Sequence, residues 1–531
     1  MQHKYKKLIY SILAVFCATS LFTSCIGDLD VDIIDPNSDQ QFNQDAVFAR
    51  LYASLALTGI EGAAGQGDVD GIDEGTSCFV RLIFNLNTLP TDEAICAWFD
   101  DPGIPTLNFA TWGANHDQIG GMFARLYFNI VLNSHFLSQT EGRNDEHTRR
   151  QRAEARFLRA LNWFYLMDMF GDVVFLDRVT SDLPEFISRA DLFDYILSEL
   201  ALAEPDMFEP RQAPRYRVDK AANWLLRSRV LLNAQVYTGT ARWADAATYA
   251  RRVMDSAYEL APVYAHLFMA DNDGSGTVNQ AYREIIFPIA QHGVRIRTWG
   301  AGTFLVASTH ISGMPNHGST GAWGGNRARA SLVNKFFPGG NIPADAFIAP
   351  NQTGAGDTRA MFFIHEEAGA ERSPVIQNPD QFREGFSVTK FRNVRADGGV
   401  TSDVLHVDMD IPFMRLAEAY LIFAEATLRA GGDAGAALTA VNAIRTRAGA
   451  TPFAPPLTPE MVLDERAREL FFEGHRRTDL IRFGRFGGSD YVWDWKGGIA
   501  GGTRIAEHLN LFPIPASQLQ ANPNLRQNPG Y

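Results

Sequence analysis

Two parts of the chain each repeat the hydrophobic spacing of an α-helix, break at a turn, and then repeat that spacing again. The first pair covers residues 219–237 and 243–257, and the second covers residues 413–430 and 436–447. In each segment apolar residues recur three and four positions apart, which predicts an amphipathic helix. Because such a helix must bury its apolar face, two of them joined by a Gly-containing turn are expected to pack together.

The two pairs are typical of tetratricopeptide-like repeats, since small alanines stand one turn away from larger residues where the helices would cross. A further helix is predicted around residues 153–165, where Phe157, Leu161 and Phe164 fall on one face. The repeats are neither contiguous nor evenly spaced. We therefore predict a mostly α-helical protein built of tetratricopeptide-like helix-turn-helix repeats with long inserted loops.

The inserted loops are expected where Gly, Pro and Asn are concentrated. Loops of this length inside a compact protein are usually functional or disordered. The stretches contain tryptophans or acids, which favours a functional role. The stretches are residues 59–75, 102–113, 293–326 and 338–356.

The N-terminus has the layout of an export signal. Three lysines precede an apolar run over residues 8–22 that is too short to span a bilayer comfortably, and Ser24 stands directly before Cys25, as in a bacterial lipobox. We predict a lipoprotein signal peptide at residues 1–24 and lipidation of Cys25; the alternative is a cysteine that merely follows a Sec signal. Residues 25–40 are predicted to be an acidic tether and residues 41–531 a single body.

The charge distribution argues against nucleic acid as a partner. The chain has 48 Lys and Arg against 61 Asp and Glu, a formal net charge of -13, and no block of basic residues beyond the first few positions. A nucleic-acid binder needs a basic surface to neutralise phosphates. No nucleic-acid partner is expected.

The sequence lacks the common signatures of nucleophile, zinc and nucleotide enzymes. Glu465, Glu469, Glu473 and His475 lie in one charged run and could be read as a catalytic acid and base. Their four-residue spacing among arginines instead favours a salt-bridged helix face. After Cys17 and Cys25 are set aside, Cys78 and Cys96 remain, either as a disulfide or as two separate thiols.

Several longer motifs carry a family resemblance. They are LFPIPA at residues 511–516, EGHRRTDLIRFG at 473–484, RFLRA at 156–160, LPTDE at 89–93, DKAANWLLR at 219–227 and YVWDWKGG at 491–498. Together they run nearly end to end, and by them the chain resembles the SusD/RagB family of outer-membrane lipoproteins, with its starch-binding branch the nearest match.

The resemblance implies four tetratricopeptide-like helix pairs whose connecting loops form a glycan-binding face. It also implies a protein that is not an enzyme: a lipid-anchored protein exposed on the bacterial outer membrane, which captures starch or malto-oligosaccharide. Such a protein delivers the glycan, as a hinged lid, to a TonB-dependent SusC-like transporter. A peptide-binding RagB-type protein and, from the enzyme class, a helical glycoside hydrolase are the alternatives.

Carried onto this chain, the resemblance assigns an aromatic arc to Trp98, Trp299 and Trp323. An exposed indole can bury the C–H face of a pyranose while its hydroxyls stay free to hydrogen bond. Without the family, each tryptophan is as readily explained by core packing.

The hydrogen-bonding positions of the site fall on Arg81 and Asp101, with Asp73 beside them. For Arg81 the alternative is a structural salt bridge to Asp73 or Asp92. The chain departs from the starch-binding pattern at Cys96, Trp299 and Asp101. Because an ionised Asp101 accepts but does not donate hydrogen bonds, one sugar contact is expected to change.

A structural calcium ion is the one cofactor that the resemblance suggests. Residues 271–276 form an oxygen-rich turn like part of a calcium loop, although the terminal Glu of an EF-hand is missing. The predicted ligands are Asp273, Asp408 and Asp410. The alternative is a solvated acidic turn.

Overall fold

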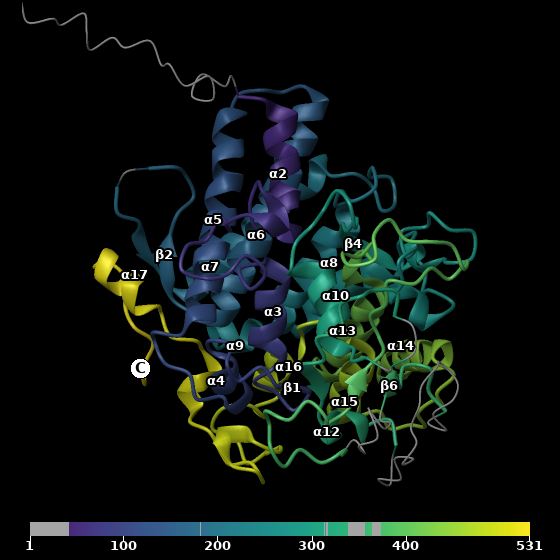
Figure 1. Cartoon of the computed structure of the whole chain (residues 1–531). Coiled ribbons are helices and arrows are strands. Elements are labelled where there is room, and N and C mark those ends of the chain that lie inside the picture. The colour runs from purple at the N-terminus through teal and green to yellow at the C-terminus, as the bar shows by residue number, and fades with distance from the viewer. Residues whose placement is uncertain (1–41, 181, 313, 315–316, 338–355, 364–372) are drawn as a thin grey trace, which may run out of the picture. The chain divides into compact units, whose positions relative to one another are not determined.

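Helices dominate the computed structural model, which describes residues 42–180, 182–312, 314, 317–337, 356–363 and 373–531. A series of them pack as successive neighbours (Figure 1), as the sequence predicts for a mostly α protein. The series runs through α5 (Asp117–Gln139), α6 (Glu146–Phe170), α7 (Arg189–Ala203), α8 (Lys220–Leu232), α10 (Trp243–Met254), α13 (Leu416–Arg429) and α14 (Ala434–Arg447).

Both predicted helix pairs are confirmed, and local chemistry sets their ends. The carboxylate of Asp219 accepts hydrogen bonds from the backbone N–H groups of Ala221 and Ala222, at 2.9 and 3.3 Å, and so begins α8. The first turn passes through Gly239 at φ 77° and the second through Gly431 at φ 68°, where glycine avoids the strain of the left-handed region. Residues 219–237 form α8 and the short α9 (Ala234–Thr238) rather than one helix.

The second pair shows why small residues stand at the helix crossing. Ala417, Leu421 and Ala424 of α13 share a buried cluster with Val441 and Ile444 of α14. Alanine side chains let the two backbones approach, and the larger residues fill the space on either side. The alternation of small and large residues that suggested tetratricopeptide-like repeats is therefore explained by the packing of α13 against α14.

Strands are short and always occur in antiparallel pairs within the described residues. The pair that matters for the site joins β1 (Ala94–Cys96) to β5 (Asn326–Ala328), with Cys96 opposite Asn326. The other pairs are β2 (Val173–Phe175) with β3 (Glu185–Ile187), β4 (Ile285–Ile289) with β8 (Ile411–Arg415), and β6 (Phe362–Phe363) with β7 (Ser387–Val388).

Two of the four predicted loops contain α-helices, which corrects the sequence prediction. Residues 102–113 include α4 (Ile104–Phe109), and residues 293–326 include α11 (Ala301–Thr309), whose side chains are all buried. The apolar run around Phe304 supplies enough burial to stabilise α11 despite the neighbouring glycines. Most of residues 338–356 lies outside the described part of the chain.

Residues 48–531 form one compact unit. The predicted boundaries at residues 24 and 40 lie outside the described residues, as does Cys25, so the signal peptide, the tether and the lipidation stay predictions. None of the described helices combines the length and the apolar character that crossing a membrane requires.

The remaining elements connect this framework. The helices are α2 (Gln44–Ala56), α3 (Phe79–Thr88), α12 (Ala330–Val333), α15 (Pro459–Leu470), α16 (Arg476–Arg482) and α17 (Ala516–Ala521). The 3-10 turns are η2 (Gly62–Ala64), η3 (Glu204–Asp206), η4 (Tyr264–Phe268), η5 (Ala281–Arg283), η6 (Lys496–Gly498) and η7 (Glu507–Asn510).

Candidate functional site

The pairing of β1 with β5 brings two of the predicted arc tryptophans together. Trp98 follows β1 and Trp323 precedes β5, and their ring centroids lie 6.2 Å apart. The backbone N–H of Ala97 donates to the carbonyl oxygen of Gly325 at 2.9 Å. A Cβ at Gly325 would lie 2.2 Å from the Trp98 ring, so the close approach requires glycine there.

Trp299 joins the same group from the start of α11. Its ring centroid lies 6.2 Å from that of Trp323, at an interplanar angle of 50°. Trp323 is tied to α11 because its backbone N–H donates to the carbonyl oxygen of Ala307 at 2.7 Å. The structure therefore brings all three predicted tryptophans into one group, here called the tryptophan cluster, and leaves each indole partly exposed.

The loop that carries Trp299 is held by a residue that the sequence analysis did not select. One carboxylate oxygen of Glu74 accepts from the Trp299 backbone N–H at 3.0 Å, and the other accepts from the Thr298 hydroxyl at 2.7 Å. The Thr58 hydroxyl donates to the same carboxylate. Glu74 lies next to Asp73 in the sequence, but nothing in the local sequence shows that its partner is more than 200 residues away.

A buried histidine supports one side of Trp299. The His406 ring centroid lies 4.8 Å from the Trp299 ring, and the His406 side chain is buried. The indole N–H of Trp299 donates to the carbonyl oxygen of Ala63 at 3.1 Å. These contacts fix the orientation of the indole, and no signal in the sequence pointed to His406.

Arg81 belongs to α3, and its guanidinium lies next to the ring of Trp98 in the tryptophan cluster. Its guanidinium carbon is 5.7 Å from the Trp98 ring centroid and 4.8 Å from that of Phe304. One guanidinium nitrogen lies 3.9 Å from a carboxylate oxygen of Asp101, whereas Nε is buried and has no hydrogen-bond partner among the described residues. Burial lowers the pKa of Arg81.

Asp101 and Asp73 present their carboxylates near the same guanidinium. The Asp101 side chain is 49% exposed, and burial of the remainder raises the pKa of this carboxyl against the opposing effect of Arg81. Asp73 is exposed and accepts from the Thr76 backbone N–H at 3.1 Å. The alternative partner considered for Arg81 is not used, because Asp92 pairs with Arg476 at 2.7 Å.

The two cysteines of the body are separate, buried thiols. Of the two arrangements that the sequence left open, the disulfide is therefore not the one observed. Cys96 has no exposed surface, so this departure from the starch-binding pattern does not add a side chain to the surface of the cluster.

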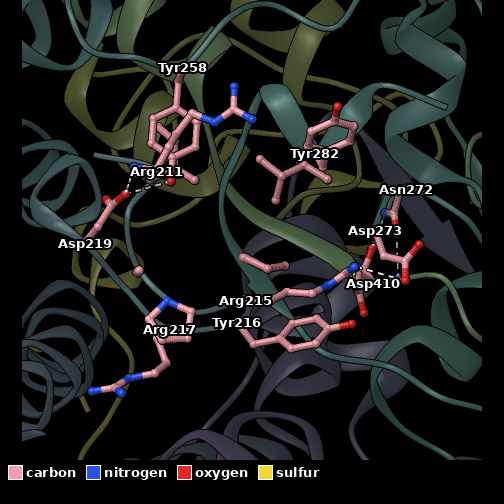
Figure 2. Close-up of a pocket in the computed structure, with 15 residues that line it drawn as sticks. Arg211, Arg215, Tyr216, Arg217, Asp219, Tyr258, Asn272, Asp273, Tyr282 and Asp410 are labelled. Carbon is pink, nitrogen blue, oxygen red and sulfur yellow. Dashed lines mark hydrogen bonds and ion pairs between the residues drawn. The ribbon is translucent and has the colours of Figure 1, made fainter. Parts of the chain in front are cut away.

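The three predicted calcium ligands do not meet as one ligand set. Asp273 and Asp410 both pair with Arg215, at 2.9 and 3.3 Å (Figure 2). Asp408 instead accepts from the backbone N–H groups of Gly293 and Ser402, at 2.8 and 2.6 Å. Within the part of the chain that the structure describes, no group of three or more His, Cys, Asp or Glu side chains is arranged to hold a metal.

These acids do not fit a cation as they stand, because Arg215 already supplies the positive charge and backbone donors occupy Asp408. The calcium site stays a prediction.

The carboxylates that could have been read as catalytic are enclosed in the protein. Glu465 and Glu469 have no exposed surface and pair with arginines, among them Arg359 at 2.7 and 2.9 Å. The predicted salt bridges are confirmed, but they lie in the core and extend to partners outside the helix. Carboxylates in this setting cannot flank a substrate in a cleft, as a glycoside hydrolase requires.

The chain is similar to known proteins over its whole length. A family model described as the SusD family matches residues 371–531. The starch-binding protein SusD of Bacteroides thetaiotaomicron is 43% identical, with 100% of both chains covered. SusD-like protein P2 of Formosa agariphila is 24% identical, over 80% of this chain and 83% of its own length.

Solved structures share the fold. A SusD-like carbohydrate-binding protein from Bacteroides fragilis matches with a TM-score of 0.70 at 20% identity, covering 91% of this chain and 98% of its own. A surface glycan-binding protein A from Bacteroides uniformis matches with a TM-score of 0.66 at 20% identity, covering 91% and 98%. The 43% identical relative is named for starch binding, in agreement with the expectation that the chain is not an enzyme. With 43% identity across the whole of both chains, the protein belongs to the SusD family.

Proposed function

We propose that the protein binds starch or malto-oligosaccharide at the tryptophan cluster. The observation that carries this proposal is the meeting of three partly exposed indoles, one after β1 and two from residues 293–326, with centroids 6.2 Å apart in each neighbouring pair. A series of tilted aromatic faces suits a curved α-glucan, because successive pyranose rings can each place a C–H face on an indole. The 43% identical relative is named for starch binding, which supports the same ligand.

Polar groups beside the cluster would hold the sugar hydroxyls. Asp101 offers a half-exposed carboxylate, and Arg81 offers a guanidinium that lies against Trp98. Because Asp101 accepts hydrogen bonds when ionised, it favours a sugar hydroxyl that donates. Asp73 adds a second carboxylate close enough to interact electrostatically with Arg81.

The proposed setting is the bacterial surface. The predicted lipidation of Cys25 would anchor the protein in the outer membrane, and the family role implies delivery of bound glycan to a TonB-dependent SusC-like transporter. The acidic tether over residues 25–40 would hold the body off the membrane.

Isothermal titration with maltoheptaose and α-cyclodextrin tests the proposal. We expect saturable binding by the wild type and at least about tenfold weaker binding by Trp98→Ala, a loss of about 1.4 kcal/mol. Trp243→Ala is the matched control, since Trp243 is a partly exposed tryptophan at the start of α10 and takes no part in the cluster. Circular dichroism checks that each variant is folded.

Unchanged affinity in Trp98→Ala would move the glucan away from the cluster. Absence of heat with both sugars would reject starch as the ligand and leave another glycan or a peptide as the cargo.

A further inference from the structure

A cavity lies apart from the tryptophan cluster and includes none of its three residues in its lining. It has a volume of about 290 Å³, is open to solvent, and is lined by the loop over residues 211–219 and by residues around 272, 282–288 and 410 (Figure 2). Pockets for small ligands range from roughly 300 to 1,000 Å³, so this cavity suits a ligand of one or two sugar rings in size.

The loop on one side of the cavity is held in an uncommon conformation. Arg211 and Tyr216 have φ values of 65° and 69°, in the left-handed region that bulky residues rarely adopt. Asp219 secures the loop, because its carboxylate accepts from the Arg211 backbone N–H at 2.7 Å and from the Tyr258 hydroxyl at 2.8 Å. Backbone strain of this kind is concentrated at ligand-binding loops, and both strained side chains line the cavity.

Flat groups line the cavity. The guanidinium carbon of Arg211 lies 5.9 Å from the Tyr258 ring centroid and 5.6 Å from that of Tyr282. The guanidinium of Arg215 lies 4.7 Å from the Tyr216 ring. Tyr282 is 40% exposed, so part of its ring is available to a ligand.

The charges around the cavity largely compensate one another. Arg215 pairs with Asp273 and Asp410, and the Nε of Arg217 donates to both carboxylate oxygens of Glu154, at 3.1 and 3.0 Å. An anion would face the carboxylates of Asp273 and Asp410, and a cation would face Arg211 and Arg215. A neutral ligand with many hydroxyl groups avoids both costs and can still use the donors and acceptors that are present.

We propose that this cavity is a second sugar site, which binds a neutral mono- or disaccharide independently of the tryptophan cluster. The pyranose C–H face would lie on Tyr282, and its hydroxyls would bond to Arg211 and Asp273. The site goes beyond the proposed capture of long glucans, because an open cavity of this volume holds a short sugar or the end of a longer one.

The test uses the Trp98→Ala variant, in which binding at the cluster is weakened. Glucose, galactose, mannose, N-acetylglucosamine and maltose are each titrated and followed by saturation-transfer NMR and calorimetry. We expect saturable binding of at least one of them in Trp98→Ala. Adding Tyr282→Ala should weaken that binding at least about tenfold, whereas Tyr282→Phe, which keeps the ring, should change it by less than about threefold.

The outcome is separable from that of the proposed function. In an otherwise wild-type chain, Tyr282→Ala should leave maltoheptaose affinity at the cluster unchanged while the short-sugar signal is lost. The proposal is overturned if none of the five sugars binds to Trp98→Ala, or if the added Tyr282→Ala leaves their binding unchanged.

Discussion

Trp323 is the central residue of the tryptophan cluster, because its ring contacts both of the others. The Trp323 ring centroid lies 6.2 Å from those of Trp98 and Trp299, at interplanar angles of 60° and 50°. Rings that are inclined in this way present their faces in successive directions, which suits a curved chain of sugars better than a flat one. The choice of glycan then depends on the polar side chains beside the cluster, where a guanidinium nitrogen of Arg81 lies 3.9 Å from a carboxylate oxygen of Asp101.

Glu74→Gln is expected to weaken glucan binding about tenfold, or about 1.4 kcal/mol. The amide would place an N–H group against either the Trp299 N–H or the hydroxyl donors, so the Trp299 loop would lose an acceptor. Titration with maltoheptaose measures the loss. Glu61→Gln, at an exposed glutamate nearby, is the control, and equal affinities in the two variants would contradict a positioning role for Glu74.

Glu93 gives a pH dependence of stability. Burial raises the pKa of Glu93 from 4.5 to about 8, and one of its carboxylate oxygens has no hydrogen-bond partner among the described residues. Between pH 4.5 and about pH 8 the folded state therefore binds more protons than the unfolded chain. The stability from Glu93 is therefore fully present below pH 4.5 and is lost as the pH rises through about 8.

Glu93→Gln cannot ionise and should escape this loss. We expect the free energy of unfolding of the variant to gain on the wild type by up to about 1.4 kcal/mol per pH unit as the pH rises from about 5 to 8. Urea unfolding of both proteins at several pH values measures the difference. A constant difference across that range would show that Glu93 is ionised throughout.

At the scale of elements, the pairing of α13 with α14 depends on a small number of buried contacts. Ile444 has no exposed surface and packs in the cluster with Leu421 and Val441. Ile444→Ala removes that contact and leaves a cavity, so the free energy of unfolding should fall by about 2–5 kcal/mol. Chemical denaturation should show a lower midpoint, and Thr439→Ala, at an exposed position of the same helix, should change it by less than about 0.5 kcal/mol.

For the whole molecule, a buried network of charges joins segments far apart in the chain. Glu469 of α15 pairs with Arg415 at the end of β8 at 2.5 Å, with Arg359 at 2.9 Å, and with Arg447 of α14. Burial alone would raise the pKa of Glu469, yet the three arginines hold it well below its usual range. One buried carboxylate therefore links α15 to the end of β8, to α14 and to the segment that carries Arg359.

Glu469→Gln should destabilise the protein by about 3–5 kcal/mol, because buried guanidinium groups would lose their compensating charge. Thermal and urea unfolding measure the change. The matched control is Asp255→Asn, which breaks an exposed pair with Arg251 and should cost no more than about 1 kcal/mol. Similar losses in the two variants would mean that the buried network contributes no more than a surface pair.

Much of this architecture is readable from short stretches of the chain. Helical periodicity, a capping Asp219 and the turn at Gly239 are local features, and they predict α8 and α10 because a helix makes its hydrogen bonds within a few residues. The same local rules missed α11, where the Gly-containing sequence is overridden by complete burial. Motifs spread along the chain indicated the family and, through it, the three tryptophans.

The sequence by itself determined the helix pairs, the acidic charge balance and the candidate residues of the site, because these depend on spacing and composition. Only the tertiary structure decided that Glu74 and His406 support Trp299, and that Arg215 lies between Asp273 and Asp410. These contacts join residues far apart in the chain. They form only when long loops are closed by the packing of the helices, so no local pattern encodes them.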